Sequence, residues 1–113
     1  MTHLILNLPQ GTVGFDFTLE AAQKLRADFD LLMQQLKIAA NAAGSPPTTK
    51  LKNLEYHNQG TVFLEVFCNP NLYPSPFAAK VLITVKHPEF RLSTEAEFCQ
   101  VSEDLDQYLT ALA

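Results

Sequence analysis

One apolar stripe with the spacing of an α-helix runs through the first half of the chain. Apolar residues recur at intervals of 3, 4, 3, 4, 3 and 4, at positions Ala22, Leu25, Phe29, Leu32, Leu36, Ala39 and Ala43. This period is typical of a helix that buries one face. Thr18 suits an N-cap, and Gly44, Pro46 and Pro47 suit a helix end. The pattern predicts a helix over about 19–43, roughly 37 Å long at 1.5 Å per residue.

Such a helix is long for the domain that would contain it. The chain has 113 residues, which suits a single α+β domain over 1–113. A typical strand is only about half as long as this helix. The helix therefore either extends past its own sheet or packs against another partner, and this favours a role in protein interaction.

The residues before the helix predict a β-hairpin. Leu4, Leu6 and Leu8 alternate with His3, Ile5 and Asn7, and Val13 and Phe15 continue a period-two pattern after a turn that contains Pro and Gly. We therefore expect a hairpin over residues 2–17.

Three further strands and a second helix are predicted after the long helix. Period-two alternation covers 52–57, 61–68 and 79–86. Thr94 and Glu97 match a capping box. The last apolar stripe consists of Phe98, Val101, Leu105, Leu109 and Leu112. The predicted order is β-β-α-β-β-β-α. This is an α+β fold, in which an antiparallel sheet of about four to five strands packs against one long and one shorter helix.

Residues 61–68 are apolar on both faces of the expected strand. One face carries Val62, Leu64, Val66 and Cys68, and the other carries Phe63 and Phe67 beside Thr61 and Glu65. Apolar groups on both faces predict a central strand that is covered on both sides. If helices cover only one face, either the valine and leucine set or Phe63, Phe67 and Leu82 is left exposed. An exposed apolar patch of that kind would mark an interface.

The distribution of charge argues against nucleic acid and membrane as partners. The net charge is −4, and residues 93–113 hold five of the twelve acids and no Lys or Arg. Without a basic patch we expect no nucleic-acid partner and no binding to anionic membranes. No apolar run approaches the 18 residues of a membrane-spanning helix. Two cysteines, Cys68 and Cys99, are too few for a disulfide framework, so a reduced cytoplasmic location is expected, and a bridge between the two stays open.

Sequence motifs for catalysis or cofactor binding are missing. The chain has no glycine-rich phosphate loop, no C-x-x-C, no H-E-x-x-H and no G-x-S-x-G. A metal site of His57 and His87 with Cys68 or Glu89 would need a convergence that the spacing does not supply. We therefore expect no cofactor, no metal and no catalytic residue. Enzyme activity is disfavoured but still open, because active sites also assemble from distant residues.

One segment resembles a known family. The stretch from Phe63 through Tyr73 and Pro74, followed by a strand and by His87 and Pro88, is similar to the strand, Tyr-Pro, strand, His-Pro order of ubiquitin-conjugating enzymes and RWD-type domains. The resemblance covers about a quarter of the chain. It implies an α–β-meander scaffold and, in the enzymes, a cysteine after His-Pro. Cys99 is the only candidate and lies in a predicted helix, and the N-terminal hairpin has no place in that pattern. We therefore do not assign the chain to this family.

Two classes of function follow from these patterns. The first is a small non-catalytic protein-interaction or adaptor module, homodimeric, that acts through the helix stripe or an apolar sheet face. Its candidate interface is Phe29, Leu32, Leu36, Phe63 and Phe67. The alternative is a small-molecule-binding protein or enzyme with a pocket near the proline-rich loop 69–77, formed by Tyr73, Phe77 and His87. A protein partner could also present a basic surface to Glu103, Asp104 and Asp106.

Overall fold

The computed structural model describes residues 3–41 and 51–112 and has an α+β fold. Its elements are β1 (His3–Leu8), β2 (Gly11–Asp16), α1 (Leu19–Asn41), β3 (Leu54–Gln59), β4 (Phe63–Cys68), the 3₁₀ helix η1 (Pro70–Leu72), β5 (Lys80–His87), β6 (Phe90–Glu97) and α2 (Phe98–Leu112). The predicted fold class is confirmed. The order contains one strand more than predicted.

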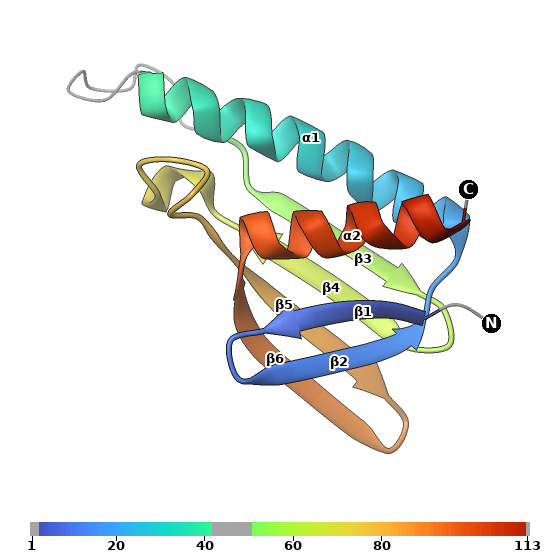
Figure 1. Cartoon of the computed structure of the whole chain (residues 1–113). Coiled ribbons are helices and arrows are strands. Elements are labelled where there is room, and N and C mark those ends of the chain that lie inside the picture. Colours follow the sequence, from blue (N-terminus) through green and yellow to red (C-terminus); the bar gives the residue numbers. More distant parts are fainter. Residues whose placement is uncertain (1–2, 42–50, 113) are drawn as a thin grey trace.

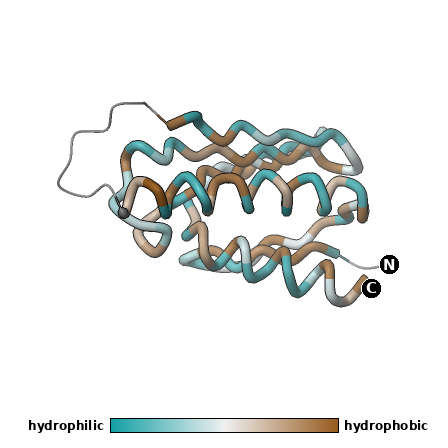
Figure 2. Tube along the Cα trace, turned by 90° about the horizontal axis from the view of Figure 1, so that it is seen from above, coloured by the Kyte–Doolittle hydropathy of each residue, from teal (hydrophilic) through white to brown (hydrophobic). Residues whose placement is uncertain are grey.

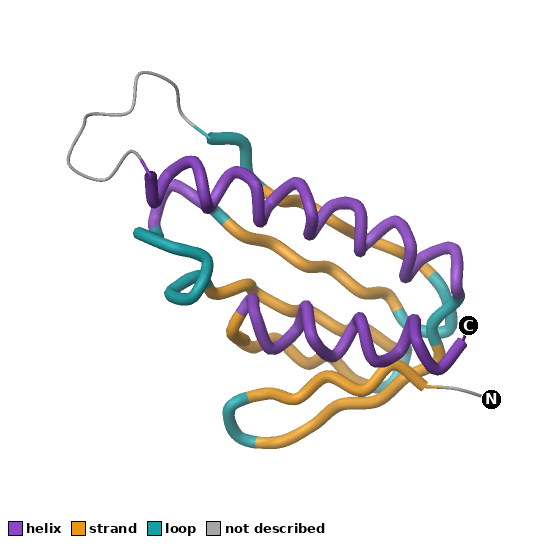
Figure 3. Tube along the Cα trace, turned by 45° about the horizontal axis from the view of Figure 1, so that its top comes forward, coloured by secondary structure: helices purple, strands orange, loops and turns teal. Residues whose placement is uncertain are grey.

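The strands form two antiparallel sheets. β1 and β2 make a separate two-stranded hairpin, and the other four strands form a meander in the order β3-β4-β5-β6. Both helices and the hairpin lie on the same side of the meander (Figure 1), and Figure 3 shows the helices lying over its strands and running in roughly the same direction as these strands. One face of the four-stranded sheet is therefore covered, and the other is open.

The extra strand replaces a predicted helix start. The prediction that a capping box of Thr94 and Glu97 starts a helix was wrong. Residues 90–97 instead form a strand that pairs with β5 along its whole length, from His87 opposite Phe90 to Lys80 opposite Glu97. A tight turn joins β5 and β6, so the entropy lost in closing the loop is small. The pairing of the two strands then satisfies the backbone hydrogen-bonding groups that face each other. α2 begins only at Phe98, whose N–H donates to the carbonyl of Ala79, 3.0 Å away.

α1 buries its apolar stripe against the covered sheet face. Thr18 is its N-cap as predicted, with Oγ1 accepting from the N–H of Ala21 at 3.1 Å. The phenol of Tyr56 on β3 donates to the carbonyl of Ala21 at 3.0 Å and so ties the helix to the sheet. The predicted end of the helix, at Gly44, Pro46 and Pro47, lies outside the described residues. Hydrophobic and hydrophilic positions alternate along both helices and the strands (Figure 2), as expected for elements with one buried face.

A buried carboxylate joins the hairpin to α2. Asp104 is 3% exposed, and its oxygens accept from the backbone N–H and the side-chain amide of Asn7, both at 2.8 Å, and from the Gln100 amide at 2.9 Å. Tyr108 of α2 donates a further hydrogen bond to the carbonyl of Phe17. Because Asp104 binds a backbone donor of β1, α2 occupies the strand edge where another strand would pair.

We expect Asp104→Ala to destabilise the fold by about 2–3 kcal/mol, because it leaves buried donors of Asn7 without a partner. Urea unfolding followed by circular dichroism measures this difference. The matched control is Glu103→Ala, which removes an exposed acid next to it on α2. Equal unfolding midpoints for the two variants would contradict this role of Asp104.

Candidate functional site

The three helix residues of the predicted interface lie in the core. Phe29 and Leu36 are 0% exposed and Leu32 is 2% exposed. The ring of Phe29 packs against that of Phe98 on α2, with the centroids 5.1 Å apart. These side chains could reach a partner only if the core opened. In the folded chain they are therefore core residues and do not form a contact surface. The length of α1 is accounted for by contacts with α2, β3 and η1.

The C-terminal acids do not form a common outward face either. Asp104 is buried, and Asp106 forms an ion pair with Arg26 of α1, with 2.6 Å between Nη1 and Oδ1. The same guanidinium donates to the hydroxyl and the carbonyl of Ser102. Only Glu103 of the three points to solvent without such a role in the described contacts. The idea of an acidic surface for a basic partner is therefore wrong for Asp104 and weakened for Asp106.

The three residues of the predicted pocket are dispersed. Tyr73 is half-buried beside the first residue of β5, whereas His87 is the last residue of that strand. Phe77 is 87% exposed. Tyr73 lines a hollow of about 200 Å³, and His87 lines a different one beside Phe63. The described structure therefore offers no cavity shared by Tyr73, Phe77 and His87.

The proline-rich loop is held by its own hydrogen bonds. Asn69 caps η1, and Asn71 binds both the N–H and the carbonyl of Leu51, at 2.9 and 2.8 Å. The loop thereby clamps the segment that leads into β3. Asn69 and Asn71 therefore have a structural role in this loop.

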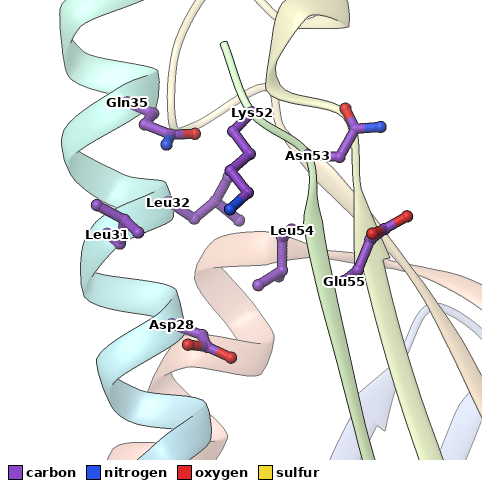
Figure 4. A pocket seen from close by; sticks show the side chains of 8 residues that line it. All are labelled: Asp28, Leu31, Leu32, Gln35, Lys52, Asn53, Leu54 and Glu55. Carbon is purple, nitrogen blue, oxygen red and sulfur yellow. The ribbon is translucent and has the colours of Figure 1, made fainter.

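A groove of about 270 Å³ lies between α1 and the segment leading into β3 (Figure 4). Its apolar floor is formed by leucines and its rim by polar side chains; the lining residues are Asp28, Leu31, Leu32, Gln35, Lys52, Asn53, Leu54 and Glu55. The lining contains no Cys, Ser or His, and its ionisable side chains are Asp28, Lys52 and Glu55.

The open face of the four-stranded sheet gathers the remaining candidate residues. Three rows of its side chains cross all four strands, β3, β4, β5 and β6, as the strand register gives them, and the pair of Lys80 and Glu97 lies beyond them on β5 and β6. The acidic row is Glu55, Phe67, Leu82 and Glu95; the middle row is His57, Glu65, Thr84 and Ser93; the basic row is Gln59, Phe63, Lys86 and Arg91. The apolar members are accessible: Leu82 is 40% exposed, and Phe63 and Phe67 are half-buried. The expectation that β4 is covered on both sides was therefore wrong.

Local contacts hold Phe63 in place within its row. The ammonium of Lys86 lies 5.3 Å from the centroid of the Phe63 ring, and the His57 ring stacks on it at 6.4 Å. On the other side of the middle row, Phe67 and Leu82 line the 200 Å³ hollow together with Tyr73 and Glu95. The open face thus has two apolar areas, separated by Glu65.

Sequence reasoning missed the charged residues of this face. Arg91 and Glu95 belong to β6, which was not predicted, so their place opposite Lys86 and Leu82 could not be foreseen. The available sequence signal was the period-two alternation from Phe90 to Glu97. In the structure, Leu92, Thr94 and Ala96 are indeed less exposed than their neighbours. The strand was missed because its alternating residues are only weakly hydrophobic and because Thr94 and Glu97 match a capping box.

Neither cysteine is an activated nucleophile. Both are free thiols; Cys68 is buried and Cys99 is half-buried. Burial raises the pKa of Cys68 to about 11, and burial together with the nearby Glu97 raises the pKa of Cys99. In the part of the chain that the structure describes, no three His, Cys, Asp or Glu side chains gather to hold a metal ion. In the same residues, neither helix has the length and apolar character needed to cross a membrane.

Comparisons with protein-family models, with curated proteins and with solved structures found no match for this chain. Cys99, the candidate for the cysteine that the Tyr-Pro and His-Pro resemblance implies, lies in the first turn of α2, and its Sγ donates a hydrogen bond to the carbonyl of Pro76. We therefore infer function from the open sheet face and not from likeness to a known protein.

We expect native Cys68 to resist alkylation by iodoacetamide at pH 8. With a pKa near 11, only about one thiol in a thousand is ionised at that pH, and the thiolate is the reacting form. Peptide mass spectrometry should show labelling that rises as the pH approaches 11, with Cys99 modified before Cys68. The urea-unfolded chain is the control and should be labelled quickly at both positions. Because Cys68 is also 1% exposed, rapid labelling of the folded chain at pH 8 would contradict both its burial and its raised pKa.

Proposed function

We propose that this chain is a protein-interaction module that binds a second copy of itself through the open face of its four-stranded sheet. The observation that carries the proposal is the accessible apolar surface of that face, formed by Leu82, which is 40% exposed, and by the half-buried Phe63 and Phe67. Leucine and phenylalanine side chains that share one face and are not covered by helices are typical of an interface.

The hydrophobic effect supplies the driving force for this contact. Two sheets that pack face to face lie about 10 Å apart and exclude water from their inner side chains. Each Leu or Phe side chain that is removed from water contributes roughly 1.5–3 kcal/mol when burial is complete. Phe63 and Phe67 are already half-buried, so association gains less from each of them than from an exposed ring.

Small-molecule binding has weaker support. The hollow beside Tyr73 has about 200 Å³, below the roughly 300 Å³ at which typical ligand pockets begin. Two of its walls, Phe67 and Leu82, belong to the open face. We therefore take this hollow as part of the interaction surface, adjacent to the 69% exposed Leu72.

We expect the protein to be a dimer at tens of micromolar and Leu82→Lys to weaken the dimer at least tenfold, about 1.4 kcal/mol. The introduced ammonium would lose its water in the interface, while in the monomer it lies opposite Glu95 and is tolerated. Light scattering at several concentrations measures the mass of each variant.

The matched control is Leu31→Lys. Leu31 is 54% exposed on α1, away from the open face, so this variant should dimerise like the original chain. Circular dichroism establishes that both variants are folded. A monomeric original chain at tens of micromolar, or equal weakening by the two substitutions, would overturn the proposal.

A further inference from the structure

The charges of the open face are distributed unevenly along its strands. Glu55 and Glu95 lie at the two ends of the acidic row, on β3 and β6. The basic row, on the other side of the middle row, has Lys86 and Arg91 side by side on β5 and β6. The two rows are four residues apart along each strand, or roughly 13 Å. Lys80 and Glu97 form a further pair beyond the acidic row, so this end of the face carries Glu55, Glu95 and Glu97 against Lys80 and is negative. The other end is positive.

This polarity selects one way of packing two copies together. A two-fold axis in the plane of the interface can run either across the strands or along them. An axis across the strands brings the acidic row of each copy onto the basic row of the other. An axis along the strands brings each row onto the same row of the second copy, with β3 facing β6.

We propose that the second copy docks with its strands reversed, about a two-fold axis that crosses the strands through the middle row. This inference rests on the proposed self-association and names the arrangement of the two copies. In it, Glu95 faces the partner's Arg91, and the symmetry produces this ion pair twice. Phe67 packs on the partner's Phe63, and Leu82 contacts the aliphatic stem of the partner's Lys86.

The alternative axis is disfavoured by its own charge pairs. It places Glu95 opposite the partner's Glu55, again twice, and leaves Arg91 opposite the amide of the partner's Gln59. Like charges that face each other across an interface oppose association by up to several kcal/mol. The reversed arrangement replaces both acidic clashes with ion pairs, and it keeps aromatic rings in contact with each other.

Within the three rows, the reversed arrangement sets like charges against each other at Glu65. This residue lies in the middle row, so its carboxylate faces the partner's Glu65 across the axis. Glu65→Gln removes that repulsion and should tighten the dimer severalfold. Under the alternative axis, Glu65 would face the partner's Thr84, and the same substitution would leave the affinity unchanged or reduce it.

Charge reversal at Arg91 and Glu95 tests the arrangement directly. Glu95→Arg sets two arginines against each other at both symmetric positions, and Arg91→Glu sets two glutamates against each other. We expect each single variant to dimerise about tenfold more weakly than the original chain. The double variant restores both ion pairs with opposite polarity, so its affinity should return to near the original.

An equimolar mixture of the two single variants gives a second measurement. A heterodimer of Glu95→Arg with Arg91→Glu contains only opposite-charge contacts at these positions, so light scattering should show dimers in the mixture at concentrations where each variant alone is monomeric. Glu103→Arg, on exposed α2 surface, is the charge-matched control and should leave the dimer unchanged.

The outcomes separate the two proposals. If the original chain dimerises and Leu82→Lys disrupts the dimer, but neither the double variant nor the mixture is rescued, the reversed arrangement is overturned and self-association stands. Tighter dimerisation of Glu95→Arg would assign the axis along the strands instead. A monomeric original chain at tens of micromolar would overturn both.

Discussion

The fold depends on the burial of the α1 stripe against one face of the four-stranded meander. Phe29, Leu32 and Leu36 supply the helix side of this contact, and Leu64, Val66 and Ile83 are among the fully buried side chains of the sheet. The described core residues of both helices, the hairpin and the sheet belong to one apolar cluster. Because both helices and the hairpin pack on the same face of the sheet, the described residues leave its other face uncovered.

Polar contacts then orient the layers around that core. Asp104 fastens α2 to the edge of β1, and Arg26 bridges α1 to Ser102 and Asp106. Buried or half-buried charged groups of this kind are retained only when they are hydrogen-bonded, and both of these are. Of the acids in the last 21 residues, Asp104 and Asp106 therefore serve the assembly of the fold.

The open face acquires its character from neighbours that are distant in sequence. Phe63, Lys86 and Arg91 come from three strands, yet the register brings them into one row. The separation of a negative end from a positive end is a property of that register alone. It turns an apolar face, which by itself accepts many partners, into one that distinguishes between two orientations of the same partner.

The local patterns determined the elements. The 3–4 spacing of α1 and the alternation in β1, β2, β4 and β5 were sufficient for the α+β class and the hairpin, because apolar residues repeat with the period of the element that buries them. They also showed that β4 is apolar on both sides. They could not reveal β6, whose alternation is weak, nor whether α1, α2 and the hairpin share one sheet face. Only the tertiary structure decided which residues are core and which are surface, since burial depends on contacts between segments far apart in the chain. That decision moved Phe29, Leu32 and Leu36 into the core and left Phe63, Phe67 and Leu82 on the open face.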